Sequence, residues 1–514
     1  MCIDGDTVTA LQPPGEMAGS LVLDASECVV SPGFIDIHTH SDLSLISCPR
    51  AESKIRQGVT TEVVGNCGTS AAPAVGPARS VIQEIADSYN VTVDWSSLEE
   101  YFLRLAEVRV SVNVASLVGA EILRLAVLGS DNVEPSNEEL VRMRELVTKG
   151  MQDGAYGLSS GLIYAPGCYA STDELVALAA EVAPFEGVYA SHIRGEGRTL
   201  LSAVEEAIMI GRKAHVRVQI SHHKAVGPRN WGMVRESLRR IEAAREEGVD
   251  VAVDVYPYKA SCTNLYAVLP PWVQDGGRDA ILKRLKEEDV RERIKSEFKE
   301  LDTSWENTVA EDGWGNIEVS GFKGPANKSL EHKRLSEIAG QRGKLPDDVV
   351  LDLISEEGFD LMAVFHEINA DDVAHVISHP LASIASDGEV GAADGPSGGT
   401  AVHPRAFGTF PRAIREYALD GGVVSLQEMI RKMTSMPAAR MGFVDRGVIG
   451  PGMKADVTIF DPVRIRDTAT YEKPSQYAQG IVHVLVNGAL TIENGEHTGM
   501  LEGRILRKAS PRGR

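Results

Sequence analysis

Between residues 33 and 387 the chain alternates short apolar runs with longer amphipathic stretches, and this alternation constrains its fold more than any other feature. Strand-length runs separated by helical patterns such as 200–214 and 231–247 predict βαβ units and a parallel sheet. Eight repeats favour a closed (β/α)8 TIM barrel over an open sheet. The runs that we interpret as strands are 33–40, 59–65, 111–118, 154–160, 187–192, 216–222, 251–256 and 382–387.

Reactive side chains stand at the ends of several of these runs. Barrel active sites are built at the C-terminal ends of the strands, so residues that end different runs are expected to meet at one face. Imidazole, thiol, phenol and carboxyl groups gathered there predict a catalytic site. The residues concerned are His40, Cys67 just past the second run, His192, His222, Tyr256 and Asp387.

The barrel is expected to span 31–445, with an insertion at about 264–363 before the last strand. Charged helical patterns at 278–299 and 347–357 predict that the insertion is helical. Two interpretations stay open for it. It is either a solvated subdomain beside the barrel mouth or a lid over the active site.

Both chain ends carry strand patterns and are expected to form one small β-sandwich domain from residues 1–30 and 446–506. The turn pair Asn487-Gly488 between two apolar runs is a hairpin signal. The polar, basic residues 507–514 are expected to form a frayed tail. The segments that predict strands are 8–11, 20–30, 454–461, 481–486 and 489–492.

Charge and cysteine content narrow the class of protein. A net charge of −21 over 514 residues argues against a nucleic acid or an anionic membrane as partner. The six cysteines include no CxxC pair, which suits a reducing compartment. The N-terminus lacks a signal-peptide pattern, and no apolar run approaches the about 20 residues of a membrane span. We therefore expect a cytoplasmic protein, whose oligomeric state the sequence leaves open.

Two histidines, His38 and His40, end the first run. Side chains two positions apart on a strand share a face, so these imidazoles are expected to lie side by side. Histidine is the commonest protein metal ligand. Alone, the pair is either half of a metal site or two surface histidines at a polar strand end.

A thiol and two further imidazoles supply a second group of candidate ligands. Cys67 lies between glycines in Gly65-Asn66-Cys67-Gly68, and His192 and His222 each follow a serine at a strand end. Each residue alone also suits a structural role, as a buried apolar thiol or a core histidine. Together, one thiolate and two imidazoles suit zinc and leave a fourth position open for water.

Asp387 and Arg405 are candidates for proton transfer and substrate binding. Asp387, in Ser386-Asp387-Gly388, is either a turn aspartate or a general base facing a metal-bound water. Arg405 follows a histidine and a proline near a glycine-rich stretch. It is either a solvated arginine or one that grips a carboxylate with two parallel hydrogen bonds.

These motifs, in this order, resemble the metal-dependent amidohydrolase superfamily and, within it, the N-acyl-D-amino-acid deacylases, or D-aminoacylases. The resemblance runs from residue 29 to about 462. The motifs that carry it are HxH at 38–40, GNCG at 65–68, GLSSGLIY at 157–164, SHIRGE at 191–196, SHHK at 221–224, DVYPY at 254–258, SDG at 386–388, HPR at 403–405, GTFPR at 408–412 and ADV at 455–457.

The resemblance implies a zinc enzyme with specified site residues. The implied ligands of a tightly bound Zn²⁺ are Cys67, His192 and His222. The implied lining of a second, weaker divalent metal site is His38, His40 and Asp387. The residues implied around the substrate are Tyr164, Lys224, Tyr256 and Arg405, with Arg405 on its carboxylate. The fourth run has no lysine to bridge two metals, which fits the cysteine-using subfamily.

Two departures from the family pattern have expected consequences. The chain begins later than its relatives usually do, so the small β domain is expected to be incomplete. Many relatives place a histidine after the glycine of the third strand, where this chain has Ala120. The missing imidazole near the mouth is expected to change the substrate range.

The function hypothesis is zinc-dependent hydrolysis of a small N-acyl-D-amino acid to a carboxylate and a free D-amino acid. Zinc lowers the pKa of bound water from about 15.7 to about 7, and Asp387 would take the proton and return it to the leaving amine. The alternatives are another amide substrate (a cyclic amide, a dipeptide with a D-residue or another N-acylated metabolite) and a non-catalytic amidohydrolase-like scaffold. The presence of the five implied cysteine and histidine ligands and of the acid/base residue Asp387 argues against the scaffold.

Overall fold

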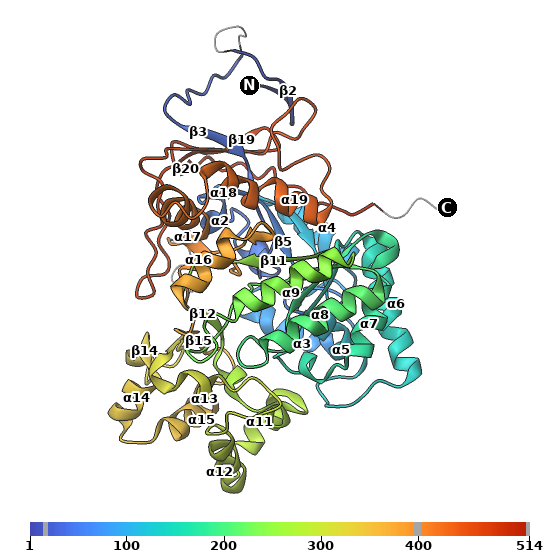
Figure 1. Cartoon of the computed structure of the whole chain (residues 1–514), viewed down its shortest axis with the longest axis vertical. Helices are drawn as coiled ribbons and strands as arrows, with labels where there is room; N and C mark the ends of the chain where they lie inside the picture. The colour runs from blue at the N-terminus through green and yellow to red at the C-terminus, as the bar shows by residue number, and fades with distance from the viewer. Residues whose placement is uncertain (14–18, 395–401, 510–514) are drawn as a thin grey trace.

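The computed structural model describes residues 1–13, 19–394 and 402–509. Figure 1 shows a barrel between two accessory parts: strands from both chain ends lie at one end of the molecule and the insertion lies at the other. Within these described residues, no helix combines the length and the apolarity needed to cross a bilayer.

Parallel strands close the barrel in two arcs. The first arc consists of β4 (Phe34–Asp36), β5 (Val59–Val64) and β6 (Asn113–Ser116). The second follows the order β7 (Val118–Gly119), β8 (Gly157–Gly161), β9 (Val188–His192), β10 (Arg217–Ile220), β11 (Val251–Val255) and β16 (Ala382–Ile384).

Two junctions join these arcs. Only Leu117 separates β6 from β7, and its N–H donates to Val64 O at 2.9 Å. Beyond β4 and β16, a parallel bridge pairs Thr39 with Gly388. Each of the predicted runs therefore coincides with a barrel strand, and the prediction of a (β/α)8 barrel is confirmed.

Helices cover the outside of the barrel, and serine residues begin many of them. Ser97, Ser136, Ser171 and Ser425 each accept a hydrogen bond from the backbone N–H of a glutamate three residues later, which caps the helix. The predicted helix 200–214 is confirmed, whereas the helix predicted at 231–247 begins three residues later. The main outer helices are α4 (Leu98–Val108), α6 (Asn137–Asp153), α7 (Thr172–Ala180), α8 (Leu200–Ala214), α9 (Val234–Glu246), α16 (Ala370–Ser378) and α18 (Leu426–Met433).

The chain ends share one antiparallel sheet of order β20-β19-β18-β17-β3. Its strands are β3 (Val29–Pro32), β17 (Val457–Phe460), β18 (Ile481–Val486), β19 (Ala489–Glu493) and β20 (Glu496–His497). The hairpin predicted at Asn487-Gly488 is confirmed, and β1 (Cys2–Asp4) pairs separately with β2 (Thr7–Ala10). The strand predicted at 20–30 is wrong for most of its length, because only its last two residues pair with a neighbour.

The predicted C-terminal tail continues from a segment that lies against the barrel. Val114 N donates to Arg504 O, and Leu506 N donates back to Val114 O at 2.7 Å. Lys508 N donates to Gly154 O at 2.9 Å, so the beginning of the expected tail is hydrogen-bonded. Residues 510–514 lie outside the described residues.

The insertion contains helices, as predicted, and also a four-stranded antiparallel sheet that the sequence patterns did not predict. The sheet has the order β12-β15-β13-β14, with β12 (Ser261–Asn264), β13 (Ile317–Ser320), β14 (Lys333–Arg334) and β15 (Met362–Phe365). Its larger helices are α11 (Gly277–Arg284), α12 (Glu288–Glu297), α14 (Leu335–Arg342) and α15 (Pro346–Glu357). A separate apolar cluster, which includes Val319 and Ile354, forms its core.

Three carboxylates attach the insertion to the loops after β9 and β10. Glu306 accepts from the Glu196 backbone N–H at 2.5 Å, and Glu311 accepts from the Asn230 side chain at 2.6 Å. Asp302 pairs with Arg198 at 2.9 Å. These contacts hold the insertion beside the barrel mouth, the location required by the lid interpretation.

A buried carboxyl on β5 makes stability depend on pH. Glu62 is fully buried, and the effect of burial outweighs the nearby Lys54 ammonium and the Ser41 and Thr39 hydroxyls, which favour its charged form. Burial raises its pKa from 4.5 to about 7. The folded state therefore holds this proton more tightly than the unfolded chain, so the contribution of Glu62 to stability is fully present below pH 4.5 and is lost as pH rises through about 7.

We expect Glu62→Gln to raise the Tm relative to wild type at pH 8, because the variant carries no buried charge there. At pH 4.5 wild type also holds a neutral side chain, and the two Tm values should be close. Calorimetry at both pH values checks this. An equal difference at the two pH values would contradict the assigned cause.

Candidate active site

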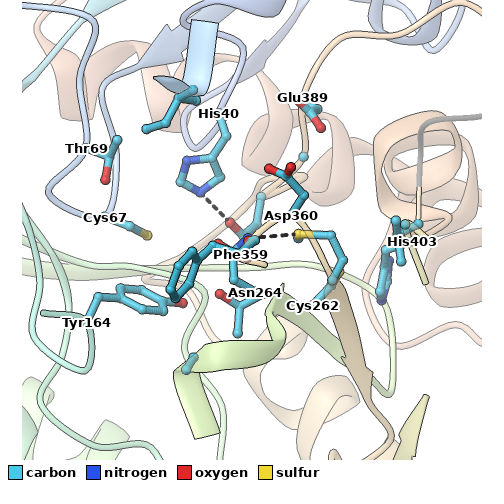
Figure 2. A pocket seen from close by; sticks show the side chains of 18 of the residues that line it. His40, Cys67, Thr69, Tyr164, Cys262, Asn264, Phe359, Asp360, Glu389 and His403 are labelled. Atoms are coloured by element: carbon cyan, nitrogen blue, oxygen red, sulfur yellow. Dashed lines mark hydrogen bonds and ion pairs between the residues drawn. The ribbon is translucent and has the colours of Figure 1, made fainter. Parts of the chain in front are cut away.

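The predicted site residues converge at the C-terminal ends of the barrel strands. Figure 2 shows His40, Cys67 and Tyr164 reaching one cavity from different elements. The cavity has a volume of about 2530 Å³ and is lined by every predicted site residue except His38. His38 lies fully buried beside Cys67.

Four potential metal-binding atoms gather around one point. His38 Nε2 lies 3.3 Å from Cys67 Sγ and 3.3 Å from Asp387 Oδ1. His222 Nε2 lies 3.6 Å from the same sulfur. All four atoms lie within 4.8 Å of one another, so they could bind one ion together. His40 Nε2 approaches Asp387 Oδ1 at 3.0 Å, so the two histidines of the HxH pair converge on one carboxylate.

A second group lies on the outer side of His222. Glu196 Oε1 is 3.0 Å from His222 Nδ1, and Glu196 Oε2 is 3.8 Å from His192 Nε2. Lys224 Nζ contacts Glu196 at 2.7 Å, His222 Nδ1 at 2.9 Å and His222 O at 3.0 Å. Lys224, expected on the substrate, thus supports a predicted metal ligand in this structure.

Three site residues adopt a left-handed backbone that non-glycine residues seldom take. Cys67 has φ +48°, His222 +36° and Asp387 +51°. Such conformations cost on the order of 1–3 kcal/mol each and persist where surrounding contacts hold them. Around Cys67 the turn needs its flanking glycine, because a Cβ on Gly65 would meet Leu117 O at 2.3 Å.

The charges of the cluster favour the ionised forms of its acidic groups. Burial raises the pKa of the Cys67 thiol, but the His38 and His222 imidazoles outweigh it and hold that pKa well below its usual range. Burial also raises the pKa of Asp387, yet the Arg405 guanidinium and the His38 imidazole hold it well below the ordinary value. A thiolate and a carboxylate therefore face the imidazoles, which is the donor chemistry of a zinc site.

The residues expected around the substrate differ in whether their polar groups already have hydrogen-bond partners within the protein. Arg405 donates through Nη1 to Asp387 Oδ2 at 2.7 Å and through Nη2 to Cys262 O at 3.0 Å. Tyr256 Oη is buried and has no partner among the described residues. The Tyr164 ring packs edge-on against His192, with ring centroids 5.1 Å apart.

Sequence reasoning missed two carboxylates that orient the histidines. Asp254 Oδ1 lies 3.2 Å from His38 Nδ1 and accepts from the His222 backbone N–H at 2.7 Å. In the same way, Glu196 Oε1 lies 3.0 Å from His222 Nδ1. Metal-bound histidines commonly use such carboxylates on their second nitrogen. Glu196 lies within the motif SHIRGE and Asp254 within DVYPY. Membership of these motifs was the sequence signal that could have identified them.

Ala120 is buried and begins α5 (Ala120–Val127) directly after β7. The next residue, Glu121, lines the cavity and accepts from the Gly161 backbone N–H at 2.7 Å. A carboxyl group therefore reaches this part of the cavity wall from the position after Ala120.

The fold and the site define a (β/α)8 barrel with a thiolate–imidazole–carboxylate cluster at its mouth. The chain belongs to the Amidohydrolase family, whose model matches residues 21–291 and 344–492. The unmatched stretch between these ranges lies in the insertion and includes β13 and α14.

Individual proteins resemble the whole chain. A D-aminoacylase of Alcaligenes xylosoxydans xylosoxydans is 34% identical over 511 residues, covering 99% of this chain and 93% of that protein. An N-acyl-D-glutamate deacylase of Bordetella bronchiseptica, solved with zinc and a phosphonate mimic of the tetrahedral intermediate, superposes with a TM-score of 0.82 at 32% identity, covering 98% and 94%. A D-aminoacylase structure described for its binuclear metal centre has a TM-score of 0.79 at 32% identity, with the same coverage.

We expect Glu196→Gln to weaken metal binding by about 10–100-fold, because His222 loses the carboxylate on its outer nitrogen, Nδ1. Titration of metal-free protein with Zn²⁺ measures this effect. Glu205→Gln, on the exposed face of α8, is the matched control and should bind zinc as wild type does. Equal affinity in the two variants would contradict the orienting role of Glu196.

Proposed function

We propose that this protein is a zinc-dependent deacylase that hydrolyses the amide bond of N-acyl-D-amino acids to a carboxylate and a free D-amino acid. The cluster of Cys67, His38, His222 and Asp387 at the barrel mouth is the observation that carries the proposal. Relatives that match nearly the whole chain, named as D-aminoacylase and N-acyl-D-glutamate deacylase, support this reaction class.

The residues present fit a bound zinc ion. His192 Nε2 is buried without a hydrogen-bond partner among the described residues, and the neighbouring imidazoles hold the pKa of the Cys67 thiol well below its usual range. We propose Cys67, His192 and His222 as ligands of the tight site, with His38, His40 and Asp387 lining a weaker one. Bound zinc would supply a hydroxide at neutral pH and polarise the amide carbonyl.

The protein's own groups then position the substrate and move the proton. Asp387, ionised in the cluster, accepts a proton from the attacking water and returns it to the leaving nitrogen. Arg405 uses two of its five donors on Asp387 and Cys262 and has others for the substrate α-carboxylate. Tyr256 keeps its proton, because burial raises its pKa well above the usual range, and its unpartnered Oη can donate to the developing oxyanion.

The decisive experiment compares N-acetyl-D-amino acids with their L-enantiomers and with hydantoins, on protein of measured zinc content. We expect turnover of the D-series alone. Asp387→Asn should reduce kcat by at least about 100-fold while the tight zinc is retained, because the proton acceptor is lost and the tight-site ligands are not. Near-normal kcat in that variant would disprove the role of Asp387, and preferred turnover of hydantoins would favour the cyclic-amide alternative.

The cavity also indicates which D-side chain is preferred. An acidic side chain would need a cation, yet nearly every Lys and Arg that lines the cavity in the described part of the chain is paired with a carboxylate. Lys473, which is exposed, is the exception. The pairs are Arg50–Glu52, Arg56–Glu52, Arg194–Glu206, Lys224–Glu196, Arg278–Glu84, Lys323–Asp360, Lys328–Glu331 and Arg405–Asp387.

Apolar and acidic groups complete this wall. The rings of Tyr266 and Phe359 pack edge-on at 5.2 Å, and both residues line the cavity. Figure 2 shows Phe359 and Asp360, from the insertion, drawn together with Glu389 and His40 in the cavity. The stretch 395–401, outside the described residues, contains no charged residue. These features favour a neutral side chain.

We expect kcat/KM for N-acetyl-D-methionine to exceed that for N-acetyl-D-glutamate by about tenfold or more, because the second carboxylate would be desolvated without a partner. Steady-state kinetics on both substrates measure the ratio. A preference for N-acetyl-D-glutamate would overturn this expectation. If that preference disappears in Lys473→Ala, this lysine binds the acidic side chain of the substrate.

We propose a cytoplasmic location, with no nucleic-acid or membrane partner. The net charge of −21 and the absence of a CxxC pair from the sequence support this proposal. The small-molecule substrate is the partner that the site itself implies.

A further inference from the structure

We propose that Lys54, together with Asp36 and Ser386, is a positioning network that fixes the backbone on both sides of Asp387. The proposal rests on the function proposed above, in which Asp387 transfers the proton. None of the three residues lines the cavity, so they act through Asp387 and not on the substrate.

Lys54 is a buried lysine whose three donors are all used. It lies on α2 (Glu52–Ile55) and is fully buried. Its Nζ donates to Asp36 Oδ2 at 2.9 Å, to Ser386 Oγ at 2.6 Å and to Gly388 O at 3.0 Å. Two of these acceptors belong to the residues immediately before and after Asp387.

Asp36 and Ser386 extend the contacts to the backbone N–H groups. Asp36 Oδ1 accepts from Ser386 N at 2.9 Å, and Ser386 Oγ accepts from Gly388 N at 3.1 Å. The N–H of Asp387 itself donates to His38 O at 2.9 Å. All three backbone N–H groups from 386 to 388, and the Gly388 carbonyl, are thereby held by hydrogen bonds.

Asp387 needs this support because of its conformation and its task. Its φ of +51° is one that an aspartate leaves readily unless neighbouring contacts prevent it. Its Oδ1 must stay 3.0 Å from His40 Nε2 and 3.3 Å from His38 Nε2, while Oδ2 stays on Arg405. Gly388 O accepts from both Lys54 Nζ and His40 N, so the same network ties the first and last barrel strands together.

The burial of the ion pair argues for a positioning role. The Lys54 and Asp36 side chains have no solvent exposure. A buried ion pair is commonly no more stabilising than apolar residues of the same volume, so stability alone is a weak reason for placing it there. What the pair supplies here is a set of directed hydrogen bonds at fixed positions, which apolar side chains could not provide.

The test uses two variants that avoid an unpaired buried charge. Ser386→Ala removes the hydroxyl that links Lys54 to Gly388, and the double variant Asp36→Asn with Lys54→Met removes both charges together. We expect kcat for the best N-acetyl-D-amino acid to fall by about 100-fold in the double variant and about tenfold in Ser386→Ala, with KM changed less than twofold. Displacement of a catalytic group by about 1 Å is sufficient for losses of this size.

Zinc titration supplies a readout independent of turnover. Metal-free protein should bind the first, tight equivalent of Zn²⁺ with unchanged affinity in both variants. Binding of a second equivalent, to which Asp387 would contribute, should weaken by about 10-fold, the size expected when the support of a metal ligand is removed.

Lys432→Met is the matched control. Lys432 is also fully buried, and its Nζ donates to His379 O and Ala382 O at the opposite end of the same strand, β16. It should lower the Tm and leave kcat and both zinc affinities unchanged. If the Lys54 and Ser386 variants behave like this control, the network is only structural and the proposal is overturned.

Failure of the proposed function is a separate result. Wild-type protein that binds zinc and hydrolyses no N-acyl-D-amino acid would refute the deacylase proposal. In that case the second zinc equivalent still decides the positioning role, because unchanged affinity in Ser386→Ala and in the double variant would overturn it.

Discussion

The closure of the barrel between its first and last strands is the contact on which the site depends. The Asp387 N–H donates to His38 O, and the His40 N–H donates to Gly388 O at 3.1 Å. These two bonds bring a carboxylate from one end of the barrel sequence to the two histidines from the other. Lys54 reinforces the same junction from behind. Without closure, the ligands would be distributed along an open sheet and could not share a metal.

The electrostatics of the site follow from that geometry. Cys67, Asp387 and Glu196 place negative charge among His38, His222, Lys224 and Arg405 within a buried volume. Each acidic group is stabilised in its ionised form by a cationic or imidazole neighbour, as the low pKa values of Cys67 and Asp387 record. The carboxylates on the outer nitrogens of the histidines direct the inner nitrogens toward the thiolate, so the geometry favours a cation at the centre.

The parts of the fold that could be predicted from the sequence are those whose pattern lies within one short stretch of the chain. Buried parallel strands are continuous apolar runs, and each predicted run contains a barrel strand. The prediction failed at 20–28, where Leu21 and Val22 are apolar but exposed and have no pairing strand. The sheet of the insertion was missed because two of its strands, β12 (Ser-Cys-Thr-Asn) and β14 (Lys-Arg), contain no apolar run. A strand exists only when a neighbour takes its hydrogen bonds, and a short pattern does not identify that neighbour.

The sequence by itself determined the strand order, the donor types at the strand ends and the family. Only the tertiary structure decided which side chains meet: His38 and His222 both approach the Cys67 sulfur, and Lys224 donates to Glu196. The physical reason is that these contacts are made across the barrel, between residues far apart in the chain. Asp254 lies 216 positions from the imidazole that it orients, and Ser386 lies 332 positions from Lys54, so no local pattern could reveal either pair.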